Sequence, residues 1–331
     1  MHQQNGLFKR PFSADELLQM LNHGHPELLE RASEVCRKSF GGRVYFRALI
    51  EISSYCHNGC YYCGLRAGNR LAGRYRMSAD EILRCCDTAA SSGYRTFVLQ
   101  GGEDPLQDDL WITELVSRIR SEFPECAITL SVGERSDDAY RMFREAGADR
   151  YLLRHETASE EHYGKLHPES MSPRNRKRCL HVLKSLGYQT GAGMMIGSPF
   201  QTASNIVEDL LFLQEFQPQM IGVGPFIPAA GTPFANEPAG SVDLTLRVLS
   251  ILRLMFPHAN IPSTTALASL RPDGDLLGLA AGANVIMPDF TLADYRARYT
   301  IYDHKSPSVP DLQRYEDAGW IISMERGDNF D

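Results

Sequence analysis

The stretch CHNGCYYCG, residues 56–64, is the strongest indication of fold and chemistry in this chain of 331 residues. Its thiols belong to Cys56, Cys60 and Cys63, so three residues and then two separate them. Thiolates at this spacing can bind three irons of a cubane cluster and leave the fourth iron without a protein ligand. The stretch therefore predicts a [4Fe–4S] cluster with one iron open to a further ligand.

A zinc site and incidental buried thiols account for these cysteines less well. A tetrahedral zinc site needs a fourth Cys or His, normally from a second ligand pair, and the chain has no second C-x-x-C or H-x-x-H pair. His57 lies between the first two cysteines, where its short tether disfavours joint ligation. Buried thiols are common in proteins, but they rarely gather in a loop that contains Asn58 and Gly59.

Composition narrows the class of protein. The hydrophobic fraction of 43% suits a large buried core, and the net charge of −7 argues against a nucleic-acid or anionic-membrane surface as the main partner. No apolar run approaches the ~18 residues that span a bilayer, and residues 1–12 lack the hydrophobic region of a signal peptide. Because three of the eight cysteines have a cluster spacing and the chain shows no disulfide framework, we expect a cytoplasmic protein.

Strand-like and helix-like segments alternate along the chain. Ser13 with Glu16, and Ser78 with Glu81, have the spacing of a capping box at a helix start, and Gly147 is typical of a helix end. The segments expected as strands are 44–52, 96–100, 127–132, 150–153, 190–196, 220–223, 260–262 and 284–287.

Eight β-then-α units without a break in composition predict the α/β class and a single complete (β/α)8 barrel of the TIM type. We divide the chain into a helical extension (1–43), the barrel (44–306) and a C-terminal tail (307–331). In such barrels the functional residues lie at the carboxyl ends of the strands and in the loops that follow.

Polar and glycine-rich segments follow the expected strands. The cysteine loop follows the first, and QGGEDP (100–105) follows the second, where glycines let the backbone approach a ligand closely. The later ones are HET (155–157), GSP (197–199), GPFIP (224–228), STT (263–265) and PD (288–289). Their coincidence predicts one functional rim.

Five longer strings carry a resemblance to a known family. They are YCGLR (62–66), LQGGEDP (99–105), RYLLRHET (150–157), GVGPFIP (222–228) and GANVIMP (282–288). Together with the cysteine triad they resemble the HydE family of [FeFe]-hydrogenase maturases, which are radical S-adenosylmethionine (SAM) enzymes. The resemblance runs from the first expected strand to the eighth.

The resemblance implies two cofactors, a [4Fe–4S] cluster on Cys56, Cys60 and Cys63, and SAM at the open iron. One electron from an external donor then cleaves the sulfonium and frees a 5′-deoxyadenosyl radical. No further catalytic residue is implied. The SAM-contacting positions implied by the resemblance are Tyr62, Gln100, Ser131, Glu156 and Arg176.

Two of these SAM positions are also compatible with a purely structural role. Glu156 can be a capping or salt-bridged residue of the barrel, although a carboxylate also suits ribose hydroxyls. Arg176 lies in RNRKR (174–178), which resembles a solvated helix start, although an arginine also pairs bidentately with a carboxylate such as the methionyl one.

The resemblance also implies a substrate and partners. The substrate is an iron dicarbonyl cyanide cysteine complex delivered by HydG, whose sulfur the deoxyadenosyl group attacks, and the iron unit then passes towards the scaffold HydF. A monomer without nucleic-acid or membrane partners is implied. The cavity positions are Arg47, Arg154, Thr264, Thr265, Met287, Tyr299 and Tyr302.

Two arginines on strands suggest the charge of the substrate. Arginine inside a barrel is costly unless an anion compensates it, so Arg47 and Arg154 favour an anionic substrate. An internal carboxylate is an equally good partner from sequence alone, and Glu51 is the candidate.

Three competing functions are weighed. Biotin synthase needs a second cluster on strand cysteines, and the corresponding positions here are Thr129 and Thr190, which disfavours sulfur insertion. Methylornithine synthase, a radical mutase, is the nearer alternative, because it lacks that second cluster and binds amino-acid carboxylates with arginines. An iron–sulfur electron carrier or scaffold would not cleave SAM, and a whole barrel is a large structure for that role.

Overall fold

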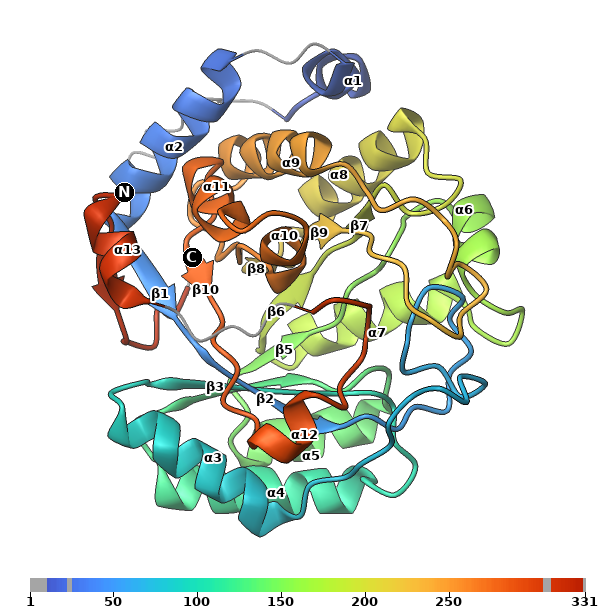
Figure 1. The fold of residues 1–331 in the computed structure, drawn as a ribbon, viewed down its shortest axis with the longest axis vertical. Coiled ribbons are helices and arrows are strands. Elements are labelled where there is room, and N and C mark those ends of the chain that lie inside the picture. The colour runs from blue at the N-terminus through green and yellow to red at the C-terminus, as the bar shows by residue number, and fades with distance from the viewer. Residues whose placement is uncertain (1–10, 23–25, 306–310, 330–331) are drawn as a thin grey trace.

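The computed structural model describes residues 11–22, 26–305 and 311–329. Parallel strands form its centre and helices surround them (Figure 1). The largest sheet has six strands in the order β2-β3-β4-β5-β6-β8, and every neighbouring pair is parallel. Their bounds are β2 (Ala48–Ser53), β3 (Thr96–Gly101), β4 (Ala127–Ser131), β5 (Arg150–Leu152), β6 (Gln189–Ala192) and β8 (Met220–Ile221).

Two smaller sheets and several single bridges extend this pairing. Strand β1 (Arg43–Phe46) lies between β10 (Val285–Ile286) and β11 (Ile321–Ser323), and β7 (Met195–Ile196) pairs with β9 (Gly224–Pro225). Parallel bridges join Met220 to Asn260, Pro262 to Val285, and Asp289 to Leu49. The parallel pairing therefore continues from β8 through residues 260–262 to β10, and from residue 289 back to β2. The α/β class is confirmed.

Three expected strands differ from the structure. The segment 44–52 forms β1 and β2, which pair with different neighbours and are separated at Arg47. The segment 190–196 is divided at Gly193, whose φ is 156° and where a Cβ atom would lie 2.0 Å from the Gly222 carbonyl oxygen. The segment 260–262 contributes only single bridges. The first segment breaks where the neighbouring strands change. The second breaks where the backbone at Gly222 comes too close for a side chain.

Helices cover the outside of the strands. Helix α2 packs on α9, and α1 packs on α8, so the N-terminal helices add an outer layer (Figure 1). Among the described residues the helices are α1 (Ala14–Asn22), α2 (Pro26–Phe40), α3 (Ala79–Ser91), α4 (Asp109–Glu122), α5 (Asp137–Ala146), α6 (Glu160–Leu166), α7 (Pro173–Ser185), α8 (Ala203–Phe216), α9 (Val242–Met255), α10 (Thr265–Leu270), α11 (Gly274–Ala280), α12 (Ala293–Arg296) and α13 (Leu312–Asp317).

The helix-end signals in the sequence are confirmed. Ser78 and Glu81 form a reciprocal capping box at α3, and the Ser13 hydroxyl and Glu16 carboxylate bond each other's backbone N–H before α1. Helix α5 ends at Gly147, whose φ of 118° is left-handed. None of the described helices has the length and apolar content that a bilayer crossing requires.

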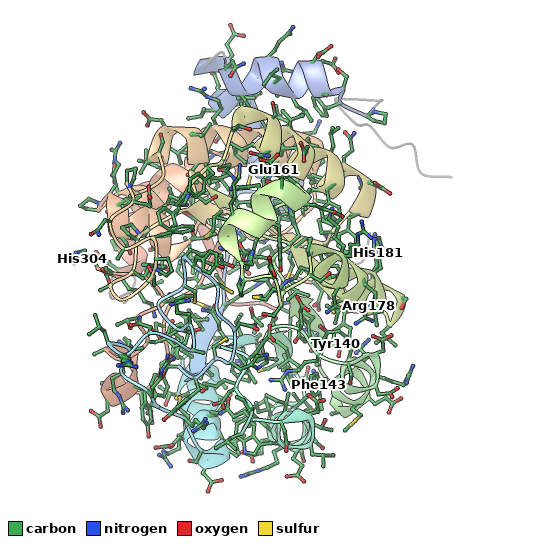
Figure 2. The ribbon with its side chains drawn as sticks, turned by 90° about the vertical axis from the view of Figure 1, so that its right-hand side faces the viewer. Tyr140, Phe143, Glu161, Arg178, His181 and His304 are labelled. Carbon is green, nitrogen blue, oxygen red and sulfur yellow. The ribbon has the colours of Figure 1, made fainter. Side chains whose placement is uncertain are left out.

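The helices that cover the strands bury apolar side chains and expose polar ones. Tyr140 and Phe143 of α5 are fully buried, whereas Arg178 and His181 of the neighbouring α7 are exposed (Figure 2). Helix α5 thus turns an apolar face inward, and α7 carries polar residues on its outer side. The core lies between the strands and these faces.

The C-terminal segment packs against the amino ends of the strands. Arg150, the first residue of β5, is fully buried and donates to the Arg326 carbonyl and the Asp328 carboxylate, each at 2.6 Å. Gln189, the first residue of β6, donates to the same carboxylate at 2.9 Å. A fully buried guanidinium needs such a partner, so residues 326–328 contribute to the stability of the sheet.

This contact predicts a pH-dependent contribution to stability. Burial acts against ionisation, but bonds from Arg326, Arg150 and Gln189 outweigh it and lower the pKa of Asp328 from 3.8 to about 2. That lowering corresponds to roughly 2 kcal/mol of stability above pH 4, which is lost as the pH falls towards 2. We expect Asp328→Asn to lower the free energy of unfolding by about this amount at pH 7, measured by urea titration. Equal stability of both proteins at pH 7 would contradict the assignment.

Candidate functional site

The cysteine loop leaves the carboxyl end of β2 and is held by backbone contacts to its neighbours. The His57 N–H donates to the Glu103 carbonyl at 3.0 Å, and the Tyr61 N–H donates to the Leu166 carbonyl at 2.9 Å. The Arg74 guanidinium donates to four loop carbonyls, those of Ser54, Leu65, Arg66 and Asn69. The loop is therefore fixed without regular secondary structure.

The glycines of the next loop allow it to approach the cysteines. A Cβ atom at Gly102 would lie 2.3 Å from the Tyr55 carbonyl oxygen and 2.6 Å from the Cys56 Cβ. Any side chain there would push the two loops apart. Gly102 thus permits a close approach to the cysteine loop, and the expected approach of this backbone to a ligand stays a prediction.

The three thiols share a poorly solvated space. Burial raises the pKa of Cys56, Cys60 and Cys63, that of Cys63 to about 12. The charges of the other two cysteines raise the pKa of Cys60 further. Three thiolates at this place therefore need a cationic centre to neutralise them, which is what the irons of a cluster provide.

The arrangement differs from a site for one metal ion. Within the described part of the chain, no group of three or more His, Cys, Asp or Glu side chains converges tightly enough to hold a single ion. A cubane does not require such convergence, because each thiolate binds a different iron. The half-buried thiols of one loop thus fit a cluster.

Three expected SAM positions lie at the ends of neighbouring strands. Gln100 of β3 pairs in register with Ser131, the last residue of β4, and with Glu51 of β2. Glu156 follows β5 and has a left-handed φ of 66°, a strained conformation for glutamate. Its Oε2 atom is buried and has no hydrogen-bond partner. A buried acceptor without a donor indicates a place for a ligand.

Burial and nearby charges have opposite effects on the pKa of Glu156, and the net effect is a raised pKa. Burial raises the pKa of Glu156, and the positive charges of Arg154 and Arg176 oppose this effect. Arg176 is 7% exposed, and its Nε lies 2.8 Å from Glu134 Oε1. The structure therefore excludes the solvated helix start for Arg176.

Tyr62 is oriented by a neutral histidine. Burial lowers the pKa of His167 to about 3, so the ring is neutral. Its Nδ1 lies 3.1 Å from the Tyr163 carbonyl, which only accepts, and its Nε2 therefore accepts from the Tyr62 hydroxyl at 3.1 Å. This tautomer fixes the direction of the Tyr62 ring beside the cysteines.

Most expected substrate positions lie near the same rim. The buried Thr264 Oγ1 has no partner, and Gln100 donates to the Tyr299 hydroxyl at 3.2 Å. Thr265 begins α10 and bonds the Tyr302 hydroxyl, and Met287 follows β10 and is half-buried. Thr264 and Met287 follow strand segments, whereas Tyr299 and Tyr302 lie in the segment after α12.

The two interior arginines lie in different surroundings. Arg154 is half-buried and faces Glu156. Arg47 is buried where the C-terminal segment packs, and donates to the Gly327 carbonyl at 3.2 Å. Glu51 forms its ion pair with Lys305, so it does not fill the role of internal partner considered for either arginine.

Sequence reasoning missed three residues of this site. Glu134 follows β4, and the rule that function collects after strands could have found it. His167 follows a helix, and Lys305 lies beyond the last expected strand. For these two the sequence carries no local signal.

Comparisons with known proteins agree with this geometry. Residues 50–213 match the model of the Radical SAM superfamily. The [FeFe] hydrogenase maturase subunit HydE of Thermotoga maritima is 45% identical over 90% of this chain and 86% of its own length. The 3-methylornithine synthase of Methanosarcina acetivorans is 32% identical over 83% of this chain and 78% of its own.

A solved structure agrees with the fold. The crystal structure of methylornithine synthase (PylB) superposes with a TM-score of 0.82, 29% identity and 95% coverage of both chains. A parallel α/β fold with the cysteine loop after its first central strand defines a radical SAM enzyme. The chain belongs to the HydE family of that superfamily.

The site predicts which cysteines matter for a cluster. Cys63→Ser should abolish the visible absorption and the electron paramagnetic resonance signal of the anaerobically reconstituted, reduced protein, because one iron loses its thiolate. Cys126→Ser is the matched control, since Cys126 is buried elsewhere and should leave the spectrum unchanged. A normal spectrum from Cys63→Ser would contradict the assignment.

Proposed function

We propose that this enzyme acts in the maturation of [FeFe] hydrogenase, holding a [4Fe–4S] cluster on Cys56, Cys60 and Cys63 and binding SAM beside it. The observation that carries the proposal is the buried, partnerless Oε2 of Glu156, whose carboxyl group lies within the electrostatic influence of Arg154 and Arg176 and close enough to the thiols to affect the pKa of Cys60. The 45% identity to the Thermotoga protein supports the role in maturation.

The cluster and SAM, when bound, supply a 5′-deoxyadenosyl radical from one electron. The chain's own residues bind and orient SAM. Glu156 would accept bonds from ribose hydroxyls, Arg176 would pair with the methionyl carboxylate, and Tyr62 would contact the adenine. Gln100 and Ser131 complete the contacts from β3 and β4. Arg176 also keeps Glu134 as a fixed partner, which holds its guanidinium in place.

We place the substrate beneath SAM in the barrel, whose complete closure we infer from the single bridges that follow β8 and precede β2. The substrate is the iron dicarbonyl cyanide cysteine complex supplied by HydG, and the product passes towards HydF, with a monomeric enzyme working in the cytoplasm. Arg154, Thr264 and Thr265 bind the anionic end of the substrate. The remaining contacts come from Arg47, Met287, Tyr299 and Tyr302.

A radical mutase is the second candidate. The TM-score of 0.82 to methylornithine synthase and 32% identity to a curated relative favour it. Incubation of the reduced protein with lysine and SAM discriminates directly, since a mutase would yield a rearranged lysine. Sulfur insertion is disfavoured because Thr129 and Thr190 stand on β4 and β6, where that reaction needs cysteines.

Loss of the Glu156 charge should weaken SAM binding. Hydrogen bonds to a charged group contribute about 1.5–3 kcal/mol, so Glu156→Gln should lower the affinity for SAM about tenfold or more in anaerobic calorimetry. Glu161→Gln is the matched control, because that carboxylate is 82% exposed on α6. Wild-type affinity in a folded Glu156→Gln protein would remove Glu156 from the site.

Loss of the Arg154 charge should separate the two halves of the reaction. Arg154→Met keeps much of the length and apolar bulk of the side chain, so SAM binding and slow formation of 5′-deoxyadenosine should persist. Conversion of the iron complex, followed by infrared spectroscopy of its carbonyl and cyanide bands, should fall at least about tenfold. The exposed Arg141→Met on α5 is the control. Full conversion by Arg154→Met would give Arg154 a structural role instead.

A further inference from the structure

A segment beyond the last described strand of the barrel crosses its opening. Residues 298–305, here called the strap, follow α12 and run across the front of the strands (Figure 1). The Gly64 N–H donates to the Ile301 carbonyl at 2.9 Å, and the Asp303 N–H donates to the Pro228 carbonyl at 3.1 Å. The strap therefore joins the cysteine loop to the loop that follows β9.

The strap packs tightly beside the last cysteine. A Cβ atom at Gly64 would lie 1.9 Å from the Thr300 carbonyl oxygen. Only glycine can follow Cys63 at this distance, so the position of the strap and that of the cysteine loop depend on each other.

The inner side of the strap carries Tyr299, Tyr302 and Lys305. Tyr299 is 2% exposed, and its hydroxyl accepts from Gln100. The residue before Lys305 is the exposed His304, whose φ of 55° is left-handed (Figure 2). This turn directs the Lys305 ammonium inward, at the cost of a strained backbone.

The Lys305 ammonium lies between two carboxylates of the barrel wall. It bonds Glu51 on β2 and lies 3.2 Å from Asp289 Oδ2, and the exposed fractions of the three side chains are 12%, 1% and 2%. The second oxygen of Glu51 is buried without a partner. Lys305 also lies 5.2 Å from the centre of the Tyr299 ring. One ammonium thus connects the strap to two strand ends.

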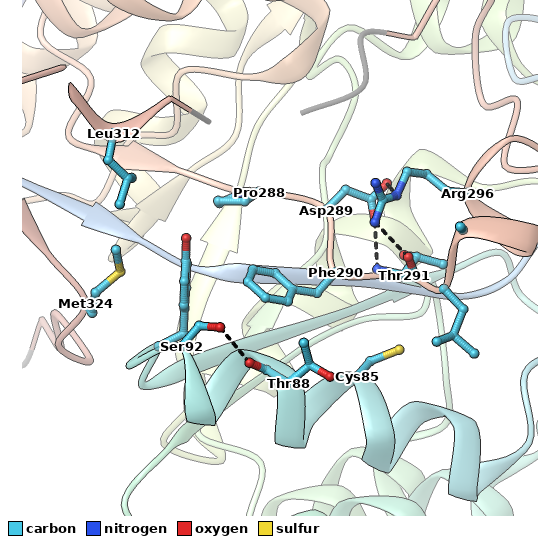
Figure 3. A pocket seen from close by; sticks show the side chains of 13 residues that line it. Cys85, Thr88, Ser92, Pro288, Asp289, Phe290, Thr291, Arg296, Leu312 and Met324 are labelled. Atoms are coloured by element: carbon cyan, nitrogen blue, oxygen red, sulfur yellow. Dashed lines mark hydrogen bonds and ion pairs between the residues drawn. The ribbon is translucent and has the colours of Figure 1, made fainter. Parts of the chain in front are cut away.

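The outer side of this wall carries a pocket and a second cation near Asp289. A pocket of about 540 Å³ lies between residues 288–296 and α3, with Asp289 and Arg296 beside each other on its wall (Figure 3). The Arg296 Nε lies 3.7 Å from Asp289 Oδ2, so a cation contacts Asp289 from the outer side as Lys305 does from the inner side. A buried ion pair adds little net stability, and its better-attested use is to select one geometry.

We propose that Lys305 is a positioning residue, whose ion pairs with Glu51 and Asp289 hold Tyr299 and Tyr302 in one place beneath the cysteine loop. The proposal rests on the proposed function, because those tyrosines are the ones assigned to the substrate cavity. The contacts of Lys305 are with Glu51, Asp289 and the Tyr299 ring, and not with the three cysteines. Lys305 acts through the strap, by making the roof of the cavity rigid when the radical forms.

The test compares Lys305→Met with Lys305→Arg in the reconstituted holoenzyme. Lys305→Met removes the ammonium and should raise the hydrogen-exchange rate of the amides of residues 299–303 by about tenfold, because the strap opens more often. The cluster should still form, because Cys56, Cys60 and Cys63 keep their thiolates, while more 5′-deoxyadenosine forms per iron complex converted. Lys305→Arg keeps the charge and should restore both values. Lys38→Met, exposed on α2, is the matched control.

Two outcomes would overturn the proposal. One is unchanged exchange of residues 299–303 in folded Lys305→Met. The other is a Lys305→Met protein whose product ratio equals that of the wild type although its strap exchanges faster. Glu51→Gln offers a second variant if Lys305→Met does not fold, and should raise exchange of the same amides. If wild-type protein fails to convert the iron complex, the proposed function fails, and the exchange data still decide whether Lys305 holds the strap.

Discussion

Three thiols in one short, half-buried loop cannot all ionise unless a cation lies among them, and the rest of the site depends on this constraint. Burial and mutual repulsion raise the pKa of Cys60 and Cys63. An apolar core would accept neutral thiols without special structure, yet here Arg74 clamps the loop through four carbonyls. A bound cluster explains why the loop is held so firmly, because the iron–thiolate bonds offset the desolvation of the three thiolates.

The parallel arrangement of strands supplies the remaining groups. Because all six central strands run in one direction, their carboxyl ends meet, and residues far apart in sequence lie around the cysteine loop. Gln100 and Ser131 are direct neighbours through strand pairing, while Glu156 reaches the site through a left-handed backbone. The strain at Glu156 and its unpartnered oxygen both occur where the fold leaves space for a ligand.

The sequence predicted what depends on local pattern. The cysteine spacing, the alternation of strands and helices, and the capping residues Ser78 and Glu81 are local, and from them the α/β class, the parallel strands and the start of α3 could be predicted. Contacts between residues far apart in the chain could not be predicted from the sequence. The break at Gly193 arises from the approach of Gly222, and the docking of Asp328 on Arg150 joins residues far apart in the chain. The partner of Glu51 was wrongly sought among arginines, because Lys305 follows every recognisable motif.

The most direct test of an open iron beside Glu156 is Mössbauer spectroscopy of ⁵⁷Fe-reconstituted protein with and without SAM. We expect one [4Fe–4S] cluster per chain, in which one iron site of the four changes its isomer shift when SAM is added. Such a change means that this iron has no protein ligand and that SAM binds to it, as expected if Glu156 holds SAM beside the cluster. Four iron sites that remain the same in saturating SAM would contradict the open iron, because every iron would then be closed by the protein.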